Sequence, residues 1–198
     1  MNVLHLDSSI LGEASASRLL TREIVERLVA QSPGSTVTYR DLVAEPLAHF
    51  SAATIAGADP AEAARDNAVL EEFLAADVVV IGAPLYNFSV PSQLKAWIDR
   101  ISVKGRTFRY TAQGPQGLAG GKRVIVATAR GGVYEPGAGT EFAESYLKFL
   151  FAFLGIDAVS FVRAEGLNLS PEERERRLTQ ARGAISALHH AARPALAA

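Results

Sequence analysis

Cysteine is absent from the 198-residue sequence, which excludes disulfides, thiolate metal sites and cysteine nucleophiles. No apolar run approaches the length of a membrane span, and the first residues lack the basic and apolar regions of a signal peptide. The formal net charge of −1 provides no overall attraction for nucleic acid or for an anionic membrane. These absences favour a cytoplasmic protein without a nucleic-acid or membrane partner.

The remaining composition is that of a folded protein, with 48% hydrophobic and 21% charged residues. A chain of this length can bury roughly 70% of its unfolded surface as one unit. No internal repeat or long linker divides it, so we expect a single domain over residues 1–198.

Short β-branched runs alternate with segments of helical periodicity along the whole chain. Strands are expected near residues 3–6, 37–42, 77–81, 123–128 and 158–162. Helices are expected near 17–30, 61–76, 140–154 and from 170 onward, and another is led in by residues 89–92 and ends near 101. Residues 44–60 are interrupted by Pro46, Gly57 and Pro60, with short helical pieces around Phe50 or Ile55. Residues 104–111 suit an extended excursion or a hairpin.

This alternation predicts an α/β fold, a three-layer sandwich with helices on both faces of a five-stranded parallel sheet. We favour the strand order 2-1-3-4-5, whose switch point lies between strands 1 and 3. The loops at residues 8–17 and 83–88 would then open onto one crevice, where ligands bind in such sheets.

Three loops could line that crevice. The first contains Ser8, Ser9, Ser15 and Ser17 before a helix, a cradle for phosphate, although such serines also serve as N-caps. It matches neither the Walker loop nor the three-glycine dinucleotide fingerprint. The second, APLYNF at 83–88, could lay N–H groups along a flat ring, or Tyr86 and Phe88 could cap the core.

The third loop, residues 129–132, ends in two glycines that permit close backbone approach, unless it is a plain turn. A phosphate cradle at one end and a ring site at the other suit a mononucleotide, and FMN is the best match. No set of histidines and acids has the spacing of a metal site, so no metal is expected.

Motifs along almost the whole chain resemble those of the FMN-dependent NADH:quinone oxidoreductases known as azoreductases. The motifs are Ser9, SAS at 15–17, APLYNF at 83–88, PSQLKAWID at 91–99, GRTFRYT at 105–111, GPQGL at 114–118 and RGG at 130–132. Residues 44–60 match more loosely. The resemblance implies a flavodoxin-like fold, a homodimer and non-covalently bound FMN.

The resemblance also implies roles for individual residues. The phosphate would be held by Ser9, Ser15, Ala16 and Ser17. The flavin ring would be held by Leu85, Tyr86, Asn87, Phe88, Ala129, Arg130, Gly131 and Gly132. Ala129 departs from the family pattern, which often has serine there, so backbone contacts are expected at this position.

The implied reaction is a two-step, ping-pong transfer of two electrons from NADH through FMN to a quinone or an aromatic azo compound. The flavin would perform the chemistry, so no protein nucleophile or other catalytic residue is expected. The N–H groups of Gly131 and Gly132 would stabilise negative charge on the ring. Phe108 and Tyr110 would form a substrate-binding aromatic wall, reaching the flavin from the partner subunit, although isolated aromatic residues are commonly packing residues.

Two other classes of protein share this fold. A flavodoxin-type electron carrier would bind FMN without an organic substrate, but such carriers tend to be strongly acidic and this chain is nearly neutral. A phosphate-sensing receiver module would need an acidic cluster at the first strand and a phosphoacceptor aspartate at the third, and residues 82–88 contain no acid. The redox enzyme is therefore the preferred interpretation.

Overall fold

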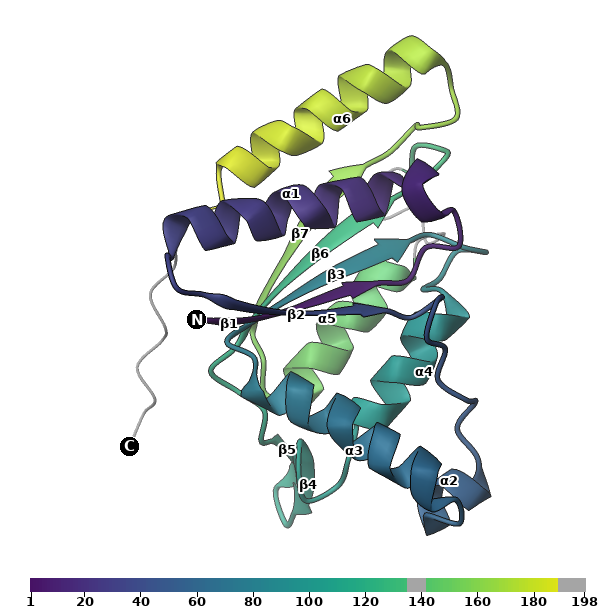
Figure 1. Cartoon of the computed structure of the whole chain (residues 1–198), viewed down its shortest axis with the longest axis vertical. Helices are drawn as coiled ribbons and strands as arrows, with labels where there is room; N and C mark the ends of the chain where they lie inside the picture. The colour runs from purple at the N-terminus through teal and green to yellow at the C-terminus, as the bar shows by residue number, and fades with distance from the viewer. Residues whose placement is uncertain (135–141, 189–198) are drawn as a thin grey trace.

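The central sheet is built from parallel strands in the order β2-β1-β3-β6-β7 (Figure 1). The computed structural model describes residues 1–134 and 142–188. The strands are β1 (Asn2–Asp7), β2 (Thr36–Asp41), β3 (Val78–Pro84), β6 (Arg123–Ala129) and β7 (Ala158–Ala164). With the separate β4–β5 hairpin left out, this is the predicted order 2-1-3-4-5, and its switch point lies between β1 and β3.

Helices cover both faces of the sheet, as predicted (Figure 1). One face carries α1 (Ala16–Gln31) and α6 (Pro171–Ser186), and the other carries α3 (Pro60–Ala75), α4 (Ser92–Ile101) and α5 (Ala143–Phe153). Two short helices, η1 (Gly12–Ala14) and α2 (Ala52–Ala56), lie in connections. Because every crossover returns the chain to the same end of the sheet, the loops after β1, β3 and β6 share one edge.

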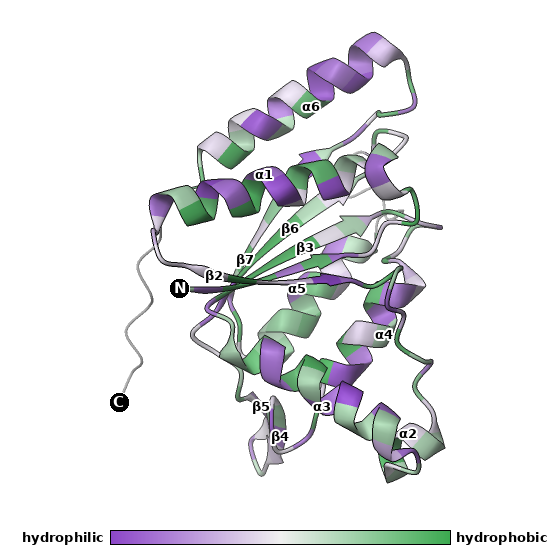
Figure 2. Cartoon of the chain, in the orientation of Figure 1, coloured by the Kyte–Doolittle hydropathy of each residue, from purple (hydrophilic) through white to green (hydrophobic). Residues whose placement is uncertain are grey.

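Burial follows the composition of the strands. Every residue of β3 is buried, and β6 is buried over most of its length, which agrees with their continuous apolar runs (Figure 2). The strand β1 is also mostly buried, although His5 interrupts its apolar residues. The alternating strand β2 lies at the sheet edge and is mostly exposed, as its polar pattern predicts.

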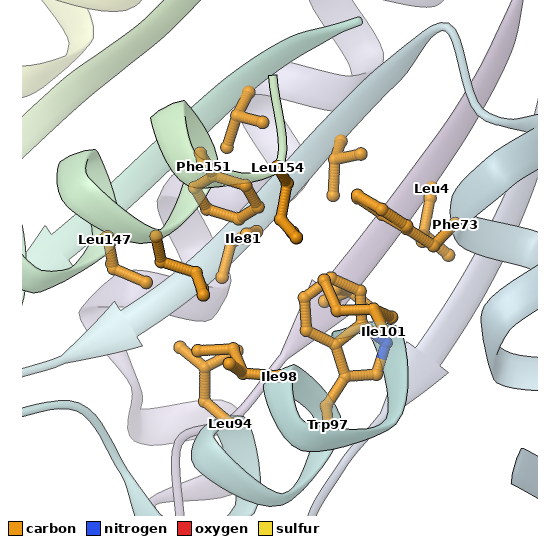
Figure 3. Packing of buried hydrophobic residues seen from close by; sticks show 14 of the residues in the cluster. Leu4, Phe73, Ile81, Leu94, Trp97, Ile98, Ile101, Leu147, Phe151 and Leu154 are labelled. Carbon is orange, nitrogen blue, oxygen red and sulfur yellow. The ribbon is translucent and has the colours of Figure 1, made fainter. Parts of the chain in front are cut away.

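The larger core cluster fixes the loop that follows β3. Side chains from α4 and α5 gather over Ile81, the centre of that strand (Figure 3). Trp97 is fully buried, and its ring meets that of Phe73 edge-on at 5.7 Å between centroids. Since β3 and α4 are both anchored in this core, the short segment between them is held at both ends.

Several boundaries differ from the sequence-based expectation. Pro91 suits an early helical position, but it is the N-cap of α4, which begins at Ser92. In residues 44–60, α2 includes Ile55, whereas Phe50 lies outside any helix. The helix expected from Thr140 begins at Ala143 in the described part, and Thr140 itself lies outside the described residues.

Candidate functional site

The three predicted loops meet at the carboxyl edge of the sheet and are joined by hydrogen bonds. The Tyr86 hydroxyl lies 3.2 Å from the Ser9 Oγ and accepts a hydrogen bond from the Ile10 N–H at 3.2 Å. The Leu85 N–H donates to the Ala129 carbonyl at 2.9 Å. The loop after β3 therefore connects the loop after β1 with the loop after β6, across the switch point.

The serines of the first loop are gathered at the start of α1. Ser9, Ser15 and Ser17 are buried, and the Oγ atoms of Ser15 and Ser17 lie 3.0 Å apart. Ser15 is also the N-cap of α1, so the capping interpretation is correct for this residue. Ala16 begins the helix, where N–H groups have no intrahelical acceptor and the dipole is positive. Hydroxyls and free N–H groups therefore lie together at the start of α1, a combination that suits an anion.

The second loop forms a tight turn with an uncommon backbone conformation. The N–H groups of Tyr86 and Ser89 each donate to the carbonyl of the other at 3.0 Å. Between them, Asn87 and Phe88 have φ angles of 48° and 68°, in the left-handed region. The Phe88 side chain is 52% exposed, so the proposed core-capping role is wrong for Phe88. Strain that packing does not explain is typical of functional sites.

A groove of about 640 Å³ opens beside this turn, within the size range of small-molecule sites. Its lining combines the turn, the first loop and the start of α4. The lining residues are Ile10, Tyr86, Asn87, Ser89, Val90, Ser92, Gln93, Lys95 and Tyr146.

The glycine loop after β6 is held from the β7 side. The carbonyls of Arg130 and Gly131 accept hydrogen bonds from the N–H groups of Leu167 and Asn168, both at 3.1 Å, and the Gly132 carbonyl accepts one from Gly166 at 2.8 Å. In a trans peptide the carbonyl and the following N–H point in opposite directions. The N–H groups of Gly131 and Gly132 are therefore turned away from β7.

The two glycines of this loop have different steric surroundings. A Cβ atom at Gly131 would lie 2.4 Å from the Asn168 Nδ2, so a side chain there requires the Asn168 side chain to move. A Cβ atom at Gly132 would have Tyr134 as its nearest neighbour, at 3.7 Å, which is ordinary contact. The described residues leave room for a Cβ atom at Gly132, so a requirement for glycine there would come from a bound ligand.

Arg130 takes part in the site through its backbone. Its side chain is 4% exposed and forms ion pairs with Glu144 at 2.6 Å and with Glu165 at 3.1 Å. These acids lie on α5 and directly after β7, so the pairs fix the loop to two neighbouring elements. Sequence reasoning missed both acids and the 166–168 segment, because these partners are distant in sequence and follow no local pattern.

A cluster of polar residues lies directly beneath the first loop. Asp7, at the end of β1, accepts hydrogen bonds from Thr21 at 2.8 Å and from Tyr39 at 3.2 Å. Burial alone raises the pKa of Asp7, but the hydrogen bonds from His5 and Thr21 and the charges of His5 and Arg18 outweigh it and lower the pKa. Burial, followed by the charges of nearby acids, raises the pKa of Tyr39 to about 12. At neutral pH this cluster therefore holds an ionised aspartate beside a neutral tyrosine.

Phe108 and Tyr110 lie apart from the three loops within one chain. They belong to the hairpin of β4 (Phe108–Thr111) and β5 (Gly114–Gly117), which confirms the expected hairpin. The Phe108 ring packs on Phe153, in the last turn of α5, at 4.7 Å between centroids. That turn leads into the start of β7, so the hairpin lies at the amino edge of the sheet.

The described residues, 1–134 and 142–188, contain no group of three or more His, Asp or Glu residues that could hold a metal ion. In the same ranges, no helix combines the length and the apolar character needed to cross a membrane.

This fold and these loops define a flavodoxin-like protein. The family model described as Flavodoxin-like fold matches residues 1–188. A protein of Xanthomonas euvesicatoria pv. vesicatoria named FMN-dependent NADH:quinone oxidoreductase 1 is 56% identical over 181 residues, covering 91% of this chain and 93% of its own. A protein of Ralstonia nicotianae named FMN-dependent NADH:quinone oxidoreductase is 54% identical, with both chains fully covered.

Solved structures agree with the sequence relatives. An azoreductase from Bacillus anthracis superposes with a TM-score of 0.85 at 31% identity, covering 94% of this chain and 97% of that one. An FMN-dependent NADH-azoreductase from the same species, solved in complex with FMN, superposes with a TM-score of 0.83 at 25% identity, covering 94% and 99%. The chain therefore belongs to the flavodoxin-like family of FMN-dependent NADH:quinone oxidoreductases and azoreductases.

Proposed function

We propose that this protein binds FMN at the carboxyl edge of its sheet and uses it to transfer two electrons from NADH to quinones and aromatic azo compounds. The observation that carries the proposal is the junction of the three loops through Tyr86–Ser9 and Leu85–Ala129. Relatives more than half identical over nearly the whole chain, named for this activity, support it.

The residues present fit FMN at both ends. The phosphate would be held by the hydroxyls of Ser9, Ser15 and Ser17 and by the N–H groups at the start of α1, from Ala16 onward. Such a site would need no lysine or arginine side chain in contact with the phosphate, because free N–H groups and the helix dipole would supply the positive potential.

The ring would lie between the turn at 85–88 and the loop at 129–132. Leu85, Tyr86, Asn87 and Phe88 would flank one edge, and the backbone of Ala129, Arg130, Gly131 and Gly132 the other. The absence of a side chain at Gly132 leaves space for a flat ligand. Flavin supplies hydride chemistry, so the protein's task is binding, orientation and electrostatic stabilisation.

The N–H groups of Gly131 and Gly132 would stabilise negative charge that develops on the reduced ring. Their direction is set in advance, since the carbonyls on the other side of the loop are bound to residues 166–168. Donors fixed before the reaction need no reorganisation during it, which is the main advantage of such sites.

The proposal includes a homodimer. On α5, one apolar stripe is buried in the core, while Phe142 is 55% exposed and Phe149 is 74% exposed on another side of the helix. Exposed aromatic residues on one helix are suited to a subunit interface. Phe108 and Tyr110 lie on the hairpin at the amino edge of the sheet, whereas the three loops lie at its carboxyl edge. These residues could therefore contribute to the substrate wall only from a partner subunit.

Anaerobic rapid mixing of the FMN-reconstituted protein tests the ping-pong mechanism. We expect NADH to bleach the flavin absorbance and a quinone, added second, to restore it without NADH present. Free FMN at the same concentration is the control. If FMN binds but NADH does not bleach it faster than free FMN, an electron carrier becomes the better account. If FMN does not bind, the proposed site is wrong.

A further inference from the structure

Arg18 holds the backbone of the phosphate loop from behind. It lies in the first turn of α1, and its side chain is only 10% exposed. Its Nε and Nη2 both donate to the Ser9 carbonyl, at 3.3 and 2.8 Å. Two donors on one carbonyl fix the orientation of the peptide that links Ser9 to Ile10.

The guanidinium is itself fixed by Asp41 at the end of β2. Nη1 lies 2.6 Å from Oδ2, and Nη2 lies 2.9 Å from Oδ1, in the two-bond geometry that suits arginine and carboxylate. The Asp41 Oδ1 also accepts hydrogen bonds from the N–H groups of Val43 and Ala44. The backbone after β2 therefore holds the carboxylate, and the carboxylate holds Arg18.

The same peptide is held from its other side by the ring loop. The Ile10 N–H points opposite to the Ser9 carbonyl and donates to the Tyr86 hydroxyl at 3.2 Å, and that hydroxyl also lies 3.2 Å from the Ser9 Oγ. Arg18 and Tyr86 thus clamp one peptide plane from both sides. Without Arg18, the Ser9 peptide could rotate and its hydroxyl would lose its fixed direction.

We propose that Arg18 and Asp41 are positioning residues that orient the Ser9 loop and thereby set the preference of the site for FMN over riboflavin. The inference rests on the proposed function. Neither residue needs to touch the cofactor, since the effect passes through the Ser9 peptide. The loss of the clamp weakens recognition of the phosphate more than recognition of the ring, because Ser9 belongs to the phosphate loop, whereas the ring is held mainly by the other two loops.

The competing explanation is that the pair only stabilises the contact between α1 and β2. That role would alter folding stability, or would weaken FMN and riboflavin equally. The ratio of the two dissociation constants separates the explanations, because the two ligands differ only in the phosphate.

The test is a titration of the flavin-free, full-length protein with FMN and with riboflavin, followed by flavin fluorescence. Arg18→Gln removes the clamp, and Asp41→Asn loosens it. Arg18→Lys keeps the positive charge but has one ammonium nitrogen in place of the three nitrogens of the guanidinium. Arg22→Gln is the control, since it removes the same charge one turn further along α1, where Arg22 forms an exposed pair with Glu13. Circular dichroism checks that each variant is folded.

We expect Arg18→Gln to raise the FMN dissociation constant by about tenfold, the loss of one well-oriented hydrogen bond to a charged group, while the riboflavin value stays within about twofold. Asp41→Asn should shift the ratio in the same direction by less, and Arg18→Lys should recover part of it. Arg22→Gln should leave it unchanged.

The inference is overturned if the ratio of the riboflavin and FMN dissociation constants is unchanged in both Arg18→Gln and Asp41→Asn, whether or not both flavins bind more weakly. The proposed function would still stand. If Arg18→Gln does not fold, Asp41→Asn decides. A wild-type protein that does not bind FMN overturns the proposed function, and the inference with it.

Discussion

Replacing Phe88 by glycine separates the function of the turn at 86–89 from its contribution to stability. Phe88 has a φ of 68°, a conformation that costs a residue with a Cβ atom about 1–2 kcal/mol and costs glycine nothing. Its ring is 52% exposed and meets that of Tyr134 edge-on at 6.5 Å between centroids. Phe88→Gly therefore removes backbone strain together with a half-buried ring.

The opposing contributions are of similar size. Full burial of a phenylalanine is worth about 1.5–3 kcal/mol, so the half-buried ring contributes about 1 kcal/mol. The greater freedom of glycine in the unfolded chain costs about 0.5–1 kcal/mol, and relief of strain returns about 1–2 kcal/mol. We expect the free energy of unfolding to change by no more than about 1 kcal/mol, or about 2–4 °C in Tm.

Thermal unfolding of the flavin-free protein, paired with FMN titration, measures both effects. Phe88→Ala is the matched control, since it loses the same ring and keeps the strain, and it should be less stable than Phe88→Gly by about 1 kcal/mol. Both variants should bind FMN about tenfold more weakly, because they lose the ring that we propose flanks the flavin. A large drop in Tm with unchanged FMN affinity would refute this reasoning and identify Phe88 as a structural cap.

Three further predictions address the glycine loop, the ion pair of Arg18 with Asp41 and the proposed subunit interface. Gly132→Val should weaken FMN binding by crowding the ring, and unchanged FMN affinity contradicts this; the smaller Gly132→Ala should leave the Tm of the flavin-free protein unchanged, because its Cβ meets no described atom nearer than Tyr134 at 3.7 Å. Hydrogen bonds from Arg18 hold the pKa of Asp41 below its usual value, so their stabilisation is present above the ordinary carboxyl pKa and is lost as the pH falls through the lowered pKa. Asp41→Asn should therefore flatten the acid side of a plot of Tm against pH, and a parallel plot would refute this. If the proposed homodimer forms through the exposed side of α5, Phe149→Glu should convert it to a monomer in analytical ultracentrifugation, and an unaltered sedimentation coefficient would show that Phe149 lies outside the interface.

The architecture could be predicted because burial on both faces leaves a strong sequence signal. β3 and β6 are continuous apolar runs, β2 alternates as an edge strand does, and proline and glycine mark the breaks. The strand order was favoured from among the common orders of doubly wound sheets, which share right-handed crossovers and a switch point. Residues 44–60 were predictable only in part, because α2 is five residues long and such helices have little periodicity.

The loops could be located, but not the contacts that hold them. Arg18 and Asp41 are 23 residues apart and Arg130 and Glu144 are 14 apart, and both pairs form only when the sheet brings different elements together. A charged residue in a helix or after a strand is usually exposed, so nothing local distinguishes these from surface charges. The positive φ of Phe88 was equally hidden, since phenylalanine seldom adopts it.

The most direct test of the account is a crystal structure of the protein reconstituted with FMN. We predict that the phosphate lies at Ser9, Ser15 and Ser17 at the start of α1, and that the ring lies between the turn at 85–88 and the N–H groups of Gly131 and Gly132. An FMN molecule bound elsewhere, or a phosphate that does not contact the first loop, would contradict the account.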